Sequence, residues 1–458
     1  MTTENNIVKH MKYFFASAFA ALLMAVSVSA PAQDAWSLER CIAQAQDANF
    51  TVQQARANVK VAILAEKQAK AARLPNVNLS TNLGEQFGRT IDPTTNGFVT
   101  TGIGYNSMSL SAGVPLFSGG QITHGIKQSR FDAQATGADA EQTSNNLALM
   151  VAQAYLSVLL AEEQSESAGR RVEQSQRQLN ATQKLIDAGT VPVADKYNVL
   201  AQIAREEQAA VAARNSVELA YLNLKQLLQL EPDFDLRIQR PKFEIPADVN
   251  PETYSLQPVY ATALEAQPNI RAADLRIKSA EEAIPLAKSD YFPSVSLAVS
   301  LSSNYSSQSL DQFFQKTPYF TQLDQNFGQG ISMQISVPIY QNGRVRLNVE
   351  RARLGLVTAQ LQQNQVRQQL KNDIQTAIAN ARAARKQLDA AQKTFESMQA
   401  AFGNTEKRHS LGAVNTLELT TAKTNLDNSE NDLIVARYDY LFKLKILDFY
   451  QGKALQLK

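Results

Sequence analysis

This 458-residue sequence has few of the residues that build metal sites and covalent cross-links. Its single cysteine, Cys41, has no partner for an intrachain disulfide. The three histidines, His10, His124 and His409, are far apart, which argues against a zinc site of the usual histidine and cysteine composition. We also find no phosphate-binding loop, H-E-x-x-H or G-x-S-x-G motif. The sequence therefore predicts no metal, cofactor or catalytic site, and we expect a protein that is not an enzyme.

Aromatic residues and net charge are also low. Aromatics make up 7% of the chain and Trp36 is the only tryptophan, which is little for several compact cores. Lys and Arg (45) nearly balance Asp and Glu (43), leaving a formal charge of +2. Because phosphate binding requires a clustered excess of basic charge, this balance argues against a nucleic-acid partner. The hydrophobic share of 44% argues against intrinsic disorder.

The N-terminus has the pattern of an export signal. Lys9 and Lys12 precede an apolar run at 14–28, and Ala-Pro-Ala at 30–32 provides a cleavage motif. We therefore predict that residues 1–32 are a signal peptide, with Met1 or Met11 as the start. The alternative is a retained membrane anchor, for which the apolar run is short. No comparable run follows, so we expect no membrane-spanning helix in the mature chain.

The same motifs occur twice along the chain in one order, which is the signature of an internal repeat. Segments 74–79 and 292–297 are similar at a shift of 218 residues, and segments 114–120 and 337–343 at a shift of 223. The shift of 223 also relates 189–195 to 412–418. The predicted organisation is a first repeat at 33–230, a connector at 231–255, a second repeat at 256–450 and a C-terminal tail at 451–458.

Each repeat contains two segments in which apolar and small polar residues alternate. This period of two extends over about ten residues, the length that a tilted strand needs to cross a bilayer. The aliphatic side would suit lipid and the hydroxyl and amide side would suit water, although a soluble sandwich with one wet face has the same pattern. Four strands cannot close a barrel around a lumen, so a membrane protein would have to oligomerise. The aliphatic positions are Val77, Leu79, Leu83, Met108, Leu110, Val114, Leu116, Val295, Leu297, Val299, Leu301, Ile331, Met333, Ile335, Val337 and Ile339.

Two stretches, 121–187 and 344–407, contain no proline and are rich in good helix formers. At about 1.5 Å per residue, each predicts a helix on the order of 100 Å long. Apolar residues at 147, 151, 154 and 158 keep helical spacing, and Met150, Tyr155 and Leu159 widen the stripe. Such lengths favour a coiled coil or the wall of a tube, and an ordinary long helical bundle fits them equally well.

The combination of these motifs resembles the TolC family of outer-membrane efflux proteins. The resemblance rests on Val-Pro-Leu-Phe-Ser-Gly-Gly at 114–120 and Val-Pro-Ile-Tyr-Gln-Asn-Gly at 337–343, each followed by a long helix, and on Ala-Arg-Tyr-Asp-Tyr-Leu at 436–441. It covers about 38–449. It implies a mainly α fold with membrane β structure: a trimer in which four strands per protomer complete a twelve-stranded barrel, continued by a long periplasmic α-helical barrel.

The resemblance also implies a function and partners. The chain would be the outer-membrane exit duct of a tripartite efflux or type I secretion system in a Gram-negative bacterium. Its partners would be two further copies of itself, a periplasmic adaptor (membrane fusion) protein, an inner-membrane pump of the resistance-nodulation-division or ABC class, and outer-membrane lipid. The alternative is a soluble periplasmic coiled-coil protein that acts like an adaptor, and an exported enzyme is a more distant possibility.

Glycines lie between the two long helices that end each repeat. Gly189 and Gly412 tolerate the left-handed conformation that ends a helix, so both predict a tight turn between helices. The resemblance implies that these turns are the surfaces that adaptor hairpins contact. The residues expected at this contact are Ala188, Gly189, Thr190, Leu411, Gly412 and Ala413.

Glu418 falls where the family often has an acidic residue that faces the tunnel axis. Three-fold symmetry would turn it into a ring of three carboxylates that attracts cations; the alternative is a solvated surface glutamate. The family's second acid would fall at Thr421, and its basic latch residue at Val414, which cannot form an ion pair. We therefore expect no salt bridge to control a gate here. Asp195 matches Glu418 in the first repeat and is expected to be its structural partner at the periplasmic gate.

The loops 84–106 and 302–328 would face the outside, and they are rich in aromatic residues. These rings would form either a constriction or an interfacial girdle, or they would pack on one another. His409, at the second turn, is expected to be an exposed histidine, with a pH sensor as the alternative. The loop aromatics are Phe87, Phe98, Tyr105, Tyr305, Phe313, Phe314, Tyr319, Phe320 and Phe327.

Overall fold

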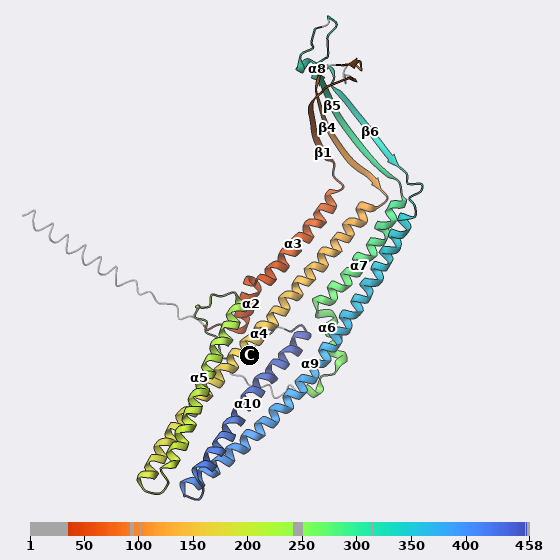
Figure 1. Cartoon of the computed structure of the whole chain (residues 1–458). Coiled ribbons are helices and arrows are strands. Elements are labelled where there is room, and N and C mark those ends of the chain that lie inside the picture. The colour runs from red at the N-terminus through yellow and green to blue at the C-terminus, as the bar shows by residue number, and fades with distance from the viewer. Residues whose placement is uncertain are drawn as a thin grey trace, which may run out of the picture. The chain divides into compact units, whose positions relative to one another are not determined.

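The computed structural model describes residues 35–91, 96–100, 102–240, 251–313, 315–453 and 455. The predicted signal peptide at 1–32, part of the connector at 241–250, and Phe314 lie outside the described residues. The described chain divides into two compact units, and Figure 1 shows its helices and strands. The first unit consists of 35–45 and 151–240, and the second of 46–150 and 251–455.

The described residues are mainly helical, as the sequence predicts. The two longest helices, α4 and α9, contain 67 residues each, and α5 and α10 contain 35 each. The helices are α2 (Leu38–Ala48), α3 (Phe50–Ala71), α4 (Gln121–Asp187), α5 (Ala194–Leu228), α6 (Leu256–Ala266), α7 (Pro268–Lys288), α8 (Tyr319–Gln325), α9 (Arg344–Ser410) and α10 (Thr416–Tyr450), with short 3-10 turns at Pro251–Thr253 and Ser289–Tyr291.

The predicted long helices are confirmed. Helix α4 begins and ends at the predicted residues, and α9 continues three residues beyond the predicted end at 407. Val151, Tyr155 and Val158 are buried as expected, whereas Met150 is exposed, so the apolar stripe of α4 is narrower than predicted. In the described part of the chain, α4 alone is long and apolar enough to cross a membrane by composition, and 56% of its apolar window is buried inside the fold. That burial is typical of a core helix.

Four antiparallel strands form one sheet in the order β1-β4-β5-β6, which confirms the four predicted strands. They are β1 (Asn76–Gln86), β4 (Ile103–Ser118), β5 (Ser294–Ser306) and β6 (Gly328–Ser336). The prediction was wrong for Val337 and Ile339, which lie beyond the end of β6. Ser336 pairs with Ser294, the first residue of β5, so no partner strand remains for the residues that follow.

The register gives the sheet two different faces. Because side chains alternate along a strand, paired residues point to the same side of the sheet. In the middle of the sheet, aliphatic residues pair mostly with aliphatic residues, and serine and asparagine pair mostly with each other. Two aliphatic rows are Leu79–Leu110–Leu301 and Ala112–Val299–Ile331, and two polar rows are Ser80–Ser109–Ser302 and Asn78–Ser111–Ser300.

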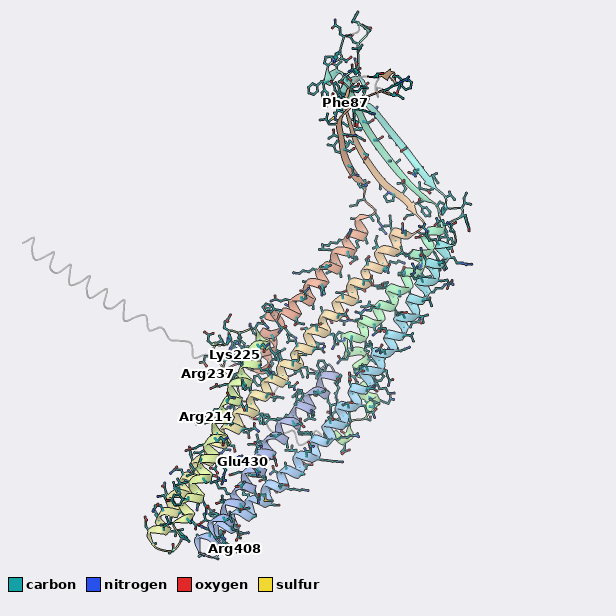
Figure 2. The ribbon with its side chains drawn as sticks, viewed as in Figure 1. Phe87, Arg214, Lys225, Arg237, Arg408 and Glu430 are labelled. Atoms are coloured by element: carbon teal, nitrogen blue, oxygen red, sulfur yellow. The ribbon has the colours of Figure 1, made fainter. Side chains whose placement is uncertain are left out.

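The two outer loops are more ordered than predicted. Strand β1 continues to Gln86 and β5 to Ser306, so the loops are shorter than 84–106 and 302–328. The first loop contains β2 (Thr90–Ile91) paired with β3 (Phe98–Val99), and the second contains α8. The rings of Tyr305 and Tyr319 lie 4.9 Å apart, and those of Tyr319 and Phe320 lie 5.3 Å apart. The aromatics of the second loop therefore pack on one another in part, while the ring of Phe87 in the first loop is exposed (Figure 2).

The second unit has an apolar core where four helices meet. Residues from α6, α7, α9 and α10 form it, and they include Val259, Ile270, Ile374 and Leu447. Burial of such side chains stabilises a fold by about 1.5–3 kcal/mol each. This core fixes α10 along α9 and so positions the turn that joins these two helices.

Candidate functional site

The first turn between helices lies in the first unit and has the geometry that its sequence predicts. Gly189 has a φ of +71°, in the left-handed region. Its N–H donates to the carbonyl of Ile186 (2.9 Å), and the N–H of Thr190 donates to the carbonyl of Leu185 (3.0 Å). This pair of bonds is the Schellman motif, which satisfies the last carbonyls of a helix. The predicted role of Gly189 as a helix terminator is confirmed.

The second turn, in the second unit, repeats the same motif. Gly412 also has a φ of +71°. Its N–H donates to the carbonyl of His409 (2.9 Å), and the N–H of Ala413 donates to the carbonyl of Arg408 (2.9 Å). A Cβ at Gly412 would meet nothing within 4 Å, so the backbone conformation rather than space requires glycine. Leu411 is 83% exposed and extends from this turn into solvent.

Glu418 lies in the first turn of α10 and has two local partners. Its N–H donates to the side-chain oxygen of Asn415 (2.9 Å), which caps the helix. Its carboxylate forms an ion pair with Arg408 (Nη1 to Oε1, 3.3 Å), which Figure 2 labels at the end of α9. The Schellman turn makes this pair possible, because it brings the last turn of α9 beside the first turn of α10. The pair lies within one chain, so the expectation that no salt bridge controls a gate stays a prediction.

His409 is buried and does not have the exposed position that the sequence predicts. Its Nε2 lies 3.4 Å from the hydroxyl oxygen of Thr416, the first residue of α10. Asp195 lies in the first turn of α5, where its N–H donates to the carbonyl of Pro192 (3.1 Å). Its expected role as the structural counterpart of Glu418 stays a prediction.

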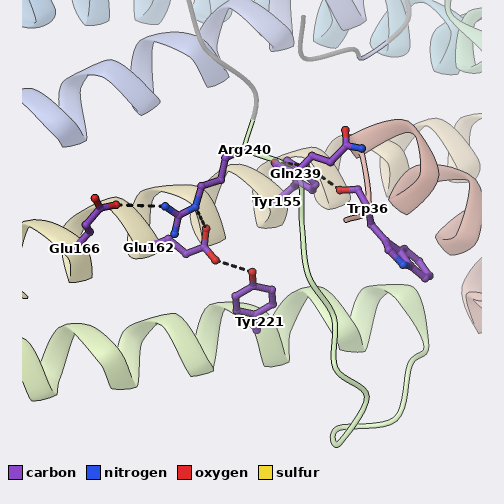
Figure 3. Close-up of polar contacts among 7 residues, drawn as sticks. All are labelled: Trp36, Tyr155, Glu162, Glu166, Tyr221, Gln239 and Arg240. Atoms are coloured by element: carbon purple, nitrogen blue, oxygen red, sulfur yellow. Dashed lines mark hydrogen bonds and ion pairs between the residues drawn. The ribbon is translucent and has the colours of Figure 1, made fainter. Parts of the chain in front are cut away.

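In the first unit, the segment after α5 is bound to the start of the described chain (Figure 3). The N–H of Trp36 donates to the carbonyl of Arg237 (2.7 Å), and the N–H of Gln239 donates to the carbonyl of Trp36 (2.9 Å). The buried hydroxyl of Tyr155 lies within hydrogen-bond distance of the carbonyls of Trp36 (3.1 Å) and Gln239 (2.7 Å). Burial raises the pKa of Tyr155, so the hydroxyl keeps its proton to donate.

Arg240 extends this attachment to α4. Its guanidinium pairs with Glu162 (2.8 Å) and Glu166 (3.3 Å), and the hydroxyl of Tyr221 donates to the other oxygen of Glu162 (2.7 Å). The hydrogen bond to Glu162 raises the pKa of Arg240, while burial and the same carboxylate raise that of Tyr221. The sequence did not predict this cluster. The connector is charged and contains proline, but these features do not indicate which residues it contacts.

In the second unit, ion pairs join neighbouring helices along their length. Burial favours the neutral form of Glu282, but hydrogen bonds from His124 and Lys127 favour the carboxylate more, so the pKa of Glu282 is lowered. No group of His, Cys, Asp or Glu in the described residues is arranged to hold a metal ion. The pairs are Glu282 with His124 (2.6 Å) and Lys127 (3.3 Å), Asp139 with Arg276, Glu141 with Arg271, Asp274 with Arg367 (3.3 Å), and Glu66 with Arg130 (3.4 Å).

The sheet leaves apolar surface and strand edges exposed. Leu79 on β1 is 73% exposed and Ile331 on β6 is 77% exposed, although both belong to the aliphatic face. Each of these two strands has only one partner in the described chain, so one edge of each is open. An exposed aliphatic face with open edges is unstable in water and requires lipid, another chain, or both.

Comparisons with known proteins agree on one kind of molecule. A family model described as "Outer membrane efflux protein" matches residues 41–229 and 259–452. Outer membrane protein TolC of Escherichia coli K12 is 28% identical over 301 residues, which is 64% of this chain and 59% of that protein. Outer membrane efflux protein BepC of Brucella suis is 22% identical and covers 93% of this chain and 88% of its own length. The crystal structure of the outer membrane protein VceC from Vibrio cholerae superposes with a TM-score of 0.75 at 17% identity, over 92% of this chain and 97% of that one.

Proposed function

We propose that this chain, which belongs to the outer membrane efflux protein family, forms the exit duct of a tripartite efflux or type I secretion system. Family membership confirms the resemblance that the sequence showed and assigns the chain to the outer membrane. The family consists of channels and transport ducts rather than enzymes. We accordingly propose no catalytic step, and substrates would be driven through the duct by a pump elsewhere.

The main support for this proposal is the sheet, through its two different faces and the order of its strands. Its aliphatic face suits lipid, and its serine and asparagine face suits a watery lumen. Because the strands alternate in direction in the order β1-β4-β5-β6, β6 of one copy would be antiparallel to β1 of the next. Three copies would then close a barrel of twelve strands and remove every open edge. The number three comes from the family, whose barrel has twelve strands, and the long helices would continue this barrel into the periplasm.

The helical turns would contact the partners. We propose that Ala188, Gly189 and Thr190 and, in the second repeat, Leu411, Gly412 and Ala413 bind hairpins of a periplasmic adaptor. Hydrogen bonds within each turn hold it in shape without a partner, and Leu411 is exposed. The adaptor would connect the duct to an inner-membrane pump of the resistance-nodulation-division or ABC class. Glu418 would add a ring of carboxylates at the periplasmic gate, with Asp195 as its structural counterpart.

We also propose that the chain consists of two repeats, 33–230 and 256–450, joined by a connector at 231–255. The equal lengths of α4 and α9 support this organisation, because α4 begins at Gln121 and α9 at Arg344, 223 residues later. The same shift relates the two glycine turns. A duplicated unit of two strands and two long helices explains why the second half repeats the order of the first.

The decisive experiment is to fractionate cells that express the full chain and to measure the mass of the purified protein in mild detergent. We expect the protein in the outer-membrane fraction, dependent on detergent, with the mass of three protomers. Recovery as a monomer or dimer that is soluble in plain buffer would overturn the proposal. It would favour the alternative of a soluble periplasmic coiled-coil protein.

A further inference from the structure

The helices and strands of the second unit meet at one level. Ser118, Ser294 and Ser336 pair across β4, β5 and β6 at the ends of these strands. Within eight residues of these positions α4 begins, α7 ends and α9 begins, and α3 ends at Ala71, shortly before β1 begins at Asn76. The backbone is closely packed here, because a Cβ at Gly119 would lie 2.5 Å from the carbonyl oxygen of Ser289. This junction is visible in Figure 1 where the arrows meet the coils.

Exposed apolar side chains occur at each of these connections. Tyrosine and phenylalanine are enriched where a membrane protein leaves the hydrocarbon and enters the headgroup layer. If the aliphatic face of the sheet lies in lipid, these residues mark the periplasmic boundary of the hydrocarbon. They are Leu74, Phe117, Tyr291, Phe292, Ile339 and Tyr340.

Four exposed basic side chains follow the apolar residues on the helical side, and we call them the basic collar: Arg73, Lys288, Arg344 and Arg346. None of the four forms an ion pair within the part of the chain that the structure describes. Arg344 donates to the amide oxygen of Gln341 (2.8 Å), and Asp290 is the acid at the same level. The collar therefore has an excess of positive charge.

One or two turns further along the helices, some of the cations are paired with acids, as Lys70 is with Glu66 and Lys127 with Glu282. At the opposite end of the sheet, the described acids Glu85, Asp311 and Asp324 outnumber the cations Arg89 and Lys316. The two ends of the sheet therefore differ in charge, with the excess of cations at the end that meets the helices.

We propose that the basic collar binds the phosphate groups of anionic phospholipids in the leaflet that faces the helices. The proposal rests on the proposed function, because it requires the sheet to lie in a membrane. Arginine suits this role, since its planar guanidinium forms two parallel hydrogen bonds with a phosphate. With the apolar residues held in the hydrocarbon boundary, the cations lie at the depth of the headgroups. The collar selects acidic lipid and sets the depth of the barrel.

The test measures lipid preference of the full-length protein reconstituted in phosphatidylcholine bilayers. Spin-labelled phosphatidylglycerol and phosphatidylcholine are compared by the fraction of label that the protein immobilises. Each basic residue near an anionic surface is worth about a five-fold change in partition, so we expect a roughly five-fold preference for phosphatidylglycerol that weakens as salt is added. A triple variant with Arg73→Gln, Lys288→Gln and Arg346→Gln keeps only Arg344 of the collar and should bring this preference most of the way towards one.

Three controls distinguish the outcomes. A triple variant with Lys60→Gln, Arg214→Gln and Lys393→Gln removes three exposed charges away from the junction and should keep the preference; its loss would assign the effect to net charge and overturn the proposal. Replacing Arg73 and Arg346 with lysine should retain most of the preference. Loss of the wild-type preference on adding inorganic phosphate at constant ionic strength would identify a site for free phosphate and overturn the headgroup assignment.

The same preparations separate this proposal from the proposed function. Each variant is first shown to be a detergent-dependent trimer that inserts into the bilayer. A wild-type trimer that inserts but binds both labelled lipids equally would overturn the basic collar alone. A wild-type chain that neither trimerises nor inserts would overturn the duct itself.

Discussion

Glu282 connects α4 to α7 through His124 and Lys127, and its carboxylate form is the stabilised one. Its pKa in the folded protein lies below the ordinary value of 4.5, so the stabilisation is present above that value and is lost as the pH falls through the folded pKa. Glu282→Gln should therefore lower stability by about 1 kcal/mol at neutral pH. The difference from wild type should shrink as the pH drops below 4.5.

Thermal unfolding of the protein in detergent, followed at a series of pH values, measures this difference. Glu281→Gln is the matched control, because Glu281 is the exposed neighbour and should show little effect at any pH. An equal loss of stability at neutral and acidic pH in Glu282→Gln would mean that packing, rather than the charge of Glu282, joins the two helices.

The hydroxyl of Tyr155 is one of the groups that hold the connector. Tyr155→Phe keeps the ring but removes the donor to the carbonyls of Trp36 and Gln239, which should cost about 1 kcal/mol. Hydrogen exchange of the Trp36 and Gln239 amides should become about five-fold faster. Tyr197→Phe, at an exposed tyrosine of α5, should leave these rates unchanged. Unchanged exchange in Tyr155→Phe would show that Arg240 and its carboxylates suffice.

Substitutions of Glu418 and Arg408 should change the ion selectivity of the pore in opposite directions. If three Glu418 carboxylates line the pore, Glu418→Ala should lower cation preference and shift the reversal potential across a salt gradient towards zero. Arg408→Gln removes the partner of Glu418 and should raise cation preference. Planar-bilayer recordings measure both, with Glu406→Ala as the control at an exposed acid of α9. Unchanged potentials in both variants would leave the Glu418 side chain with only its local ion pair to Arg408.

At the scale of elements, backbone hydrogen bonds shape each helical turn, and Ala188 and Leu411 are exposed there. Ala188→Glu and Leu411→Glu avoid the left-handed positions, so the Schellman bonds should survive. We expect at least a ten-fold loss of efflux, since a charge would be buried at the adaptor contact. Efflux is measured in cells, and trimer content in extracts.

Ala400→Glu, at an exposed position of α9 ten residues before the second turn begins, is the control and should leave efflux intact. Normal efflux in both turn variants would move the adaptor contact elsewhere on the helices. Loss of the trimer in either variant would instead show that the turn is needed for folding.

At the scale of the whole molecule, the open edges of β1 and β6 predict a contact between copies. Three double variants test this contact: Ser80→Cys is combined in turn with Gly330→Cys, Ser332→Cys or Gln334→Cys. On oxidation, at least one of them should give a cross-linked trimer, because residues that face each other on paired strands are within disulfide reach. Burial raises the pKa of the natural Cys41 to about 12, so this thiol should stay unreactive.

The control places cysteines at Ser109 and Ser302, which pair within one chain and should link only intramolecularly. Denaturing gel electrophoresis without reductant separates the products. Monomers alone for every β1–β6 pair, despite efficient closure of the control pair, would mean that these edges do not meet.

The sequence by itself determined the long helices, the four strands and the two glycine turns. These depend on local properties: the absence of proline, the periods of the apolar residues, and the freedom of Gly189 and Gly412 to take a positive φ. The ion pair of Arg408 with Glu418, the burial of His409, the clamp of Arg240 on α4 and the common level of the basic collar came only from the tertiary structure. Each depends on which segments the folded chain brings together, and periodicity along the sequence carries no information about those distances.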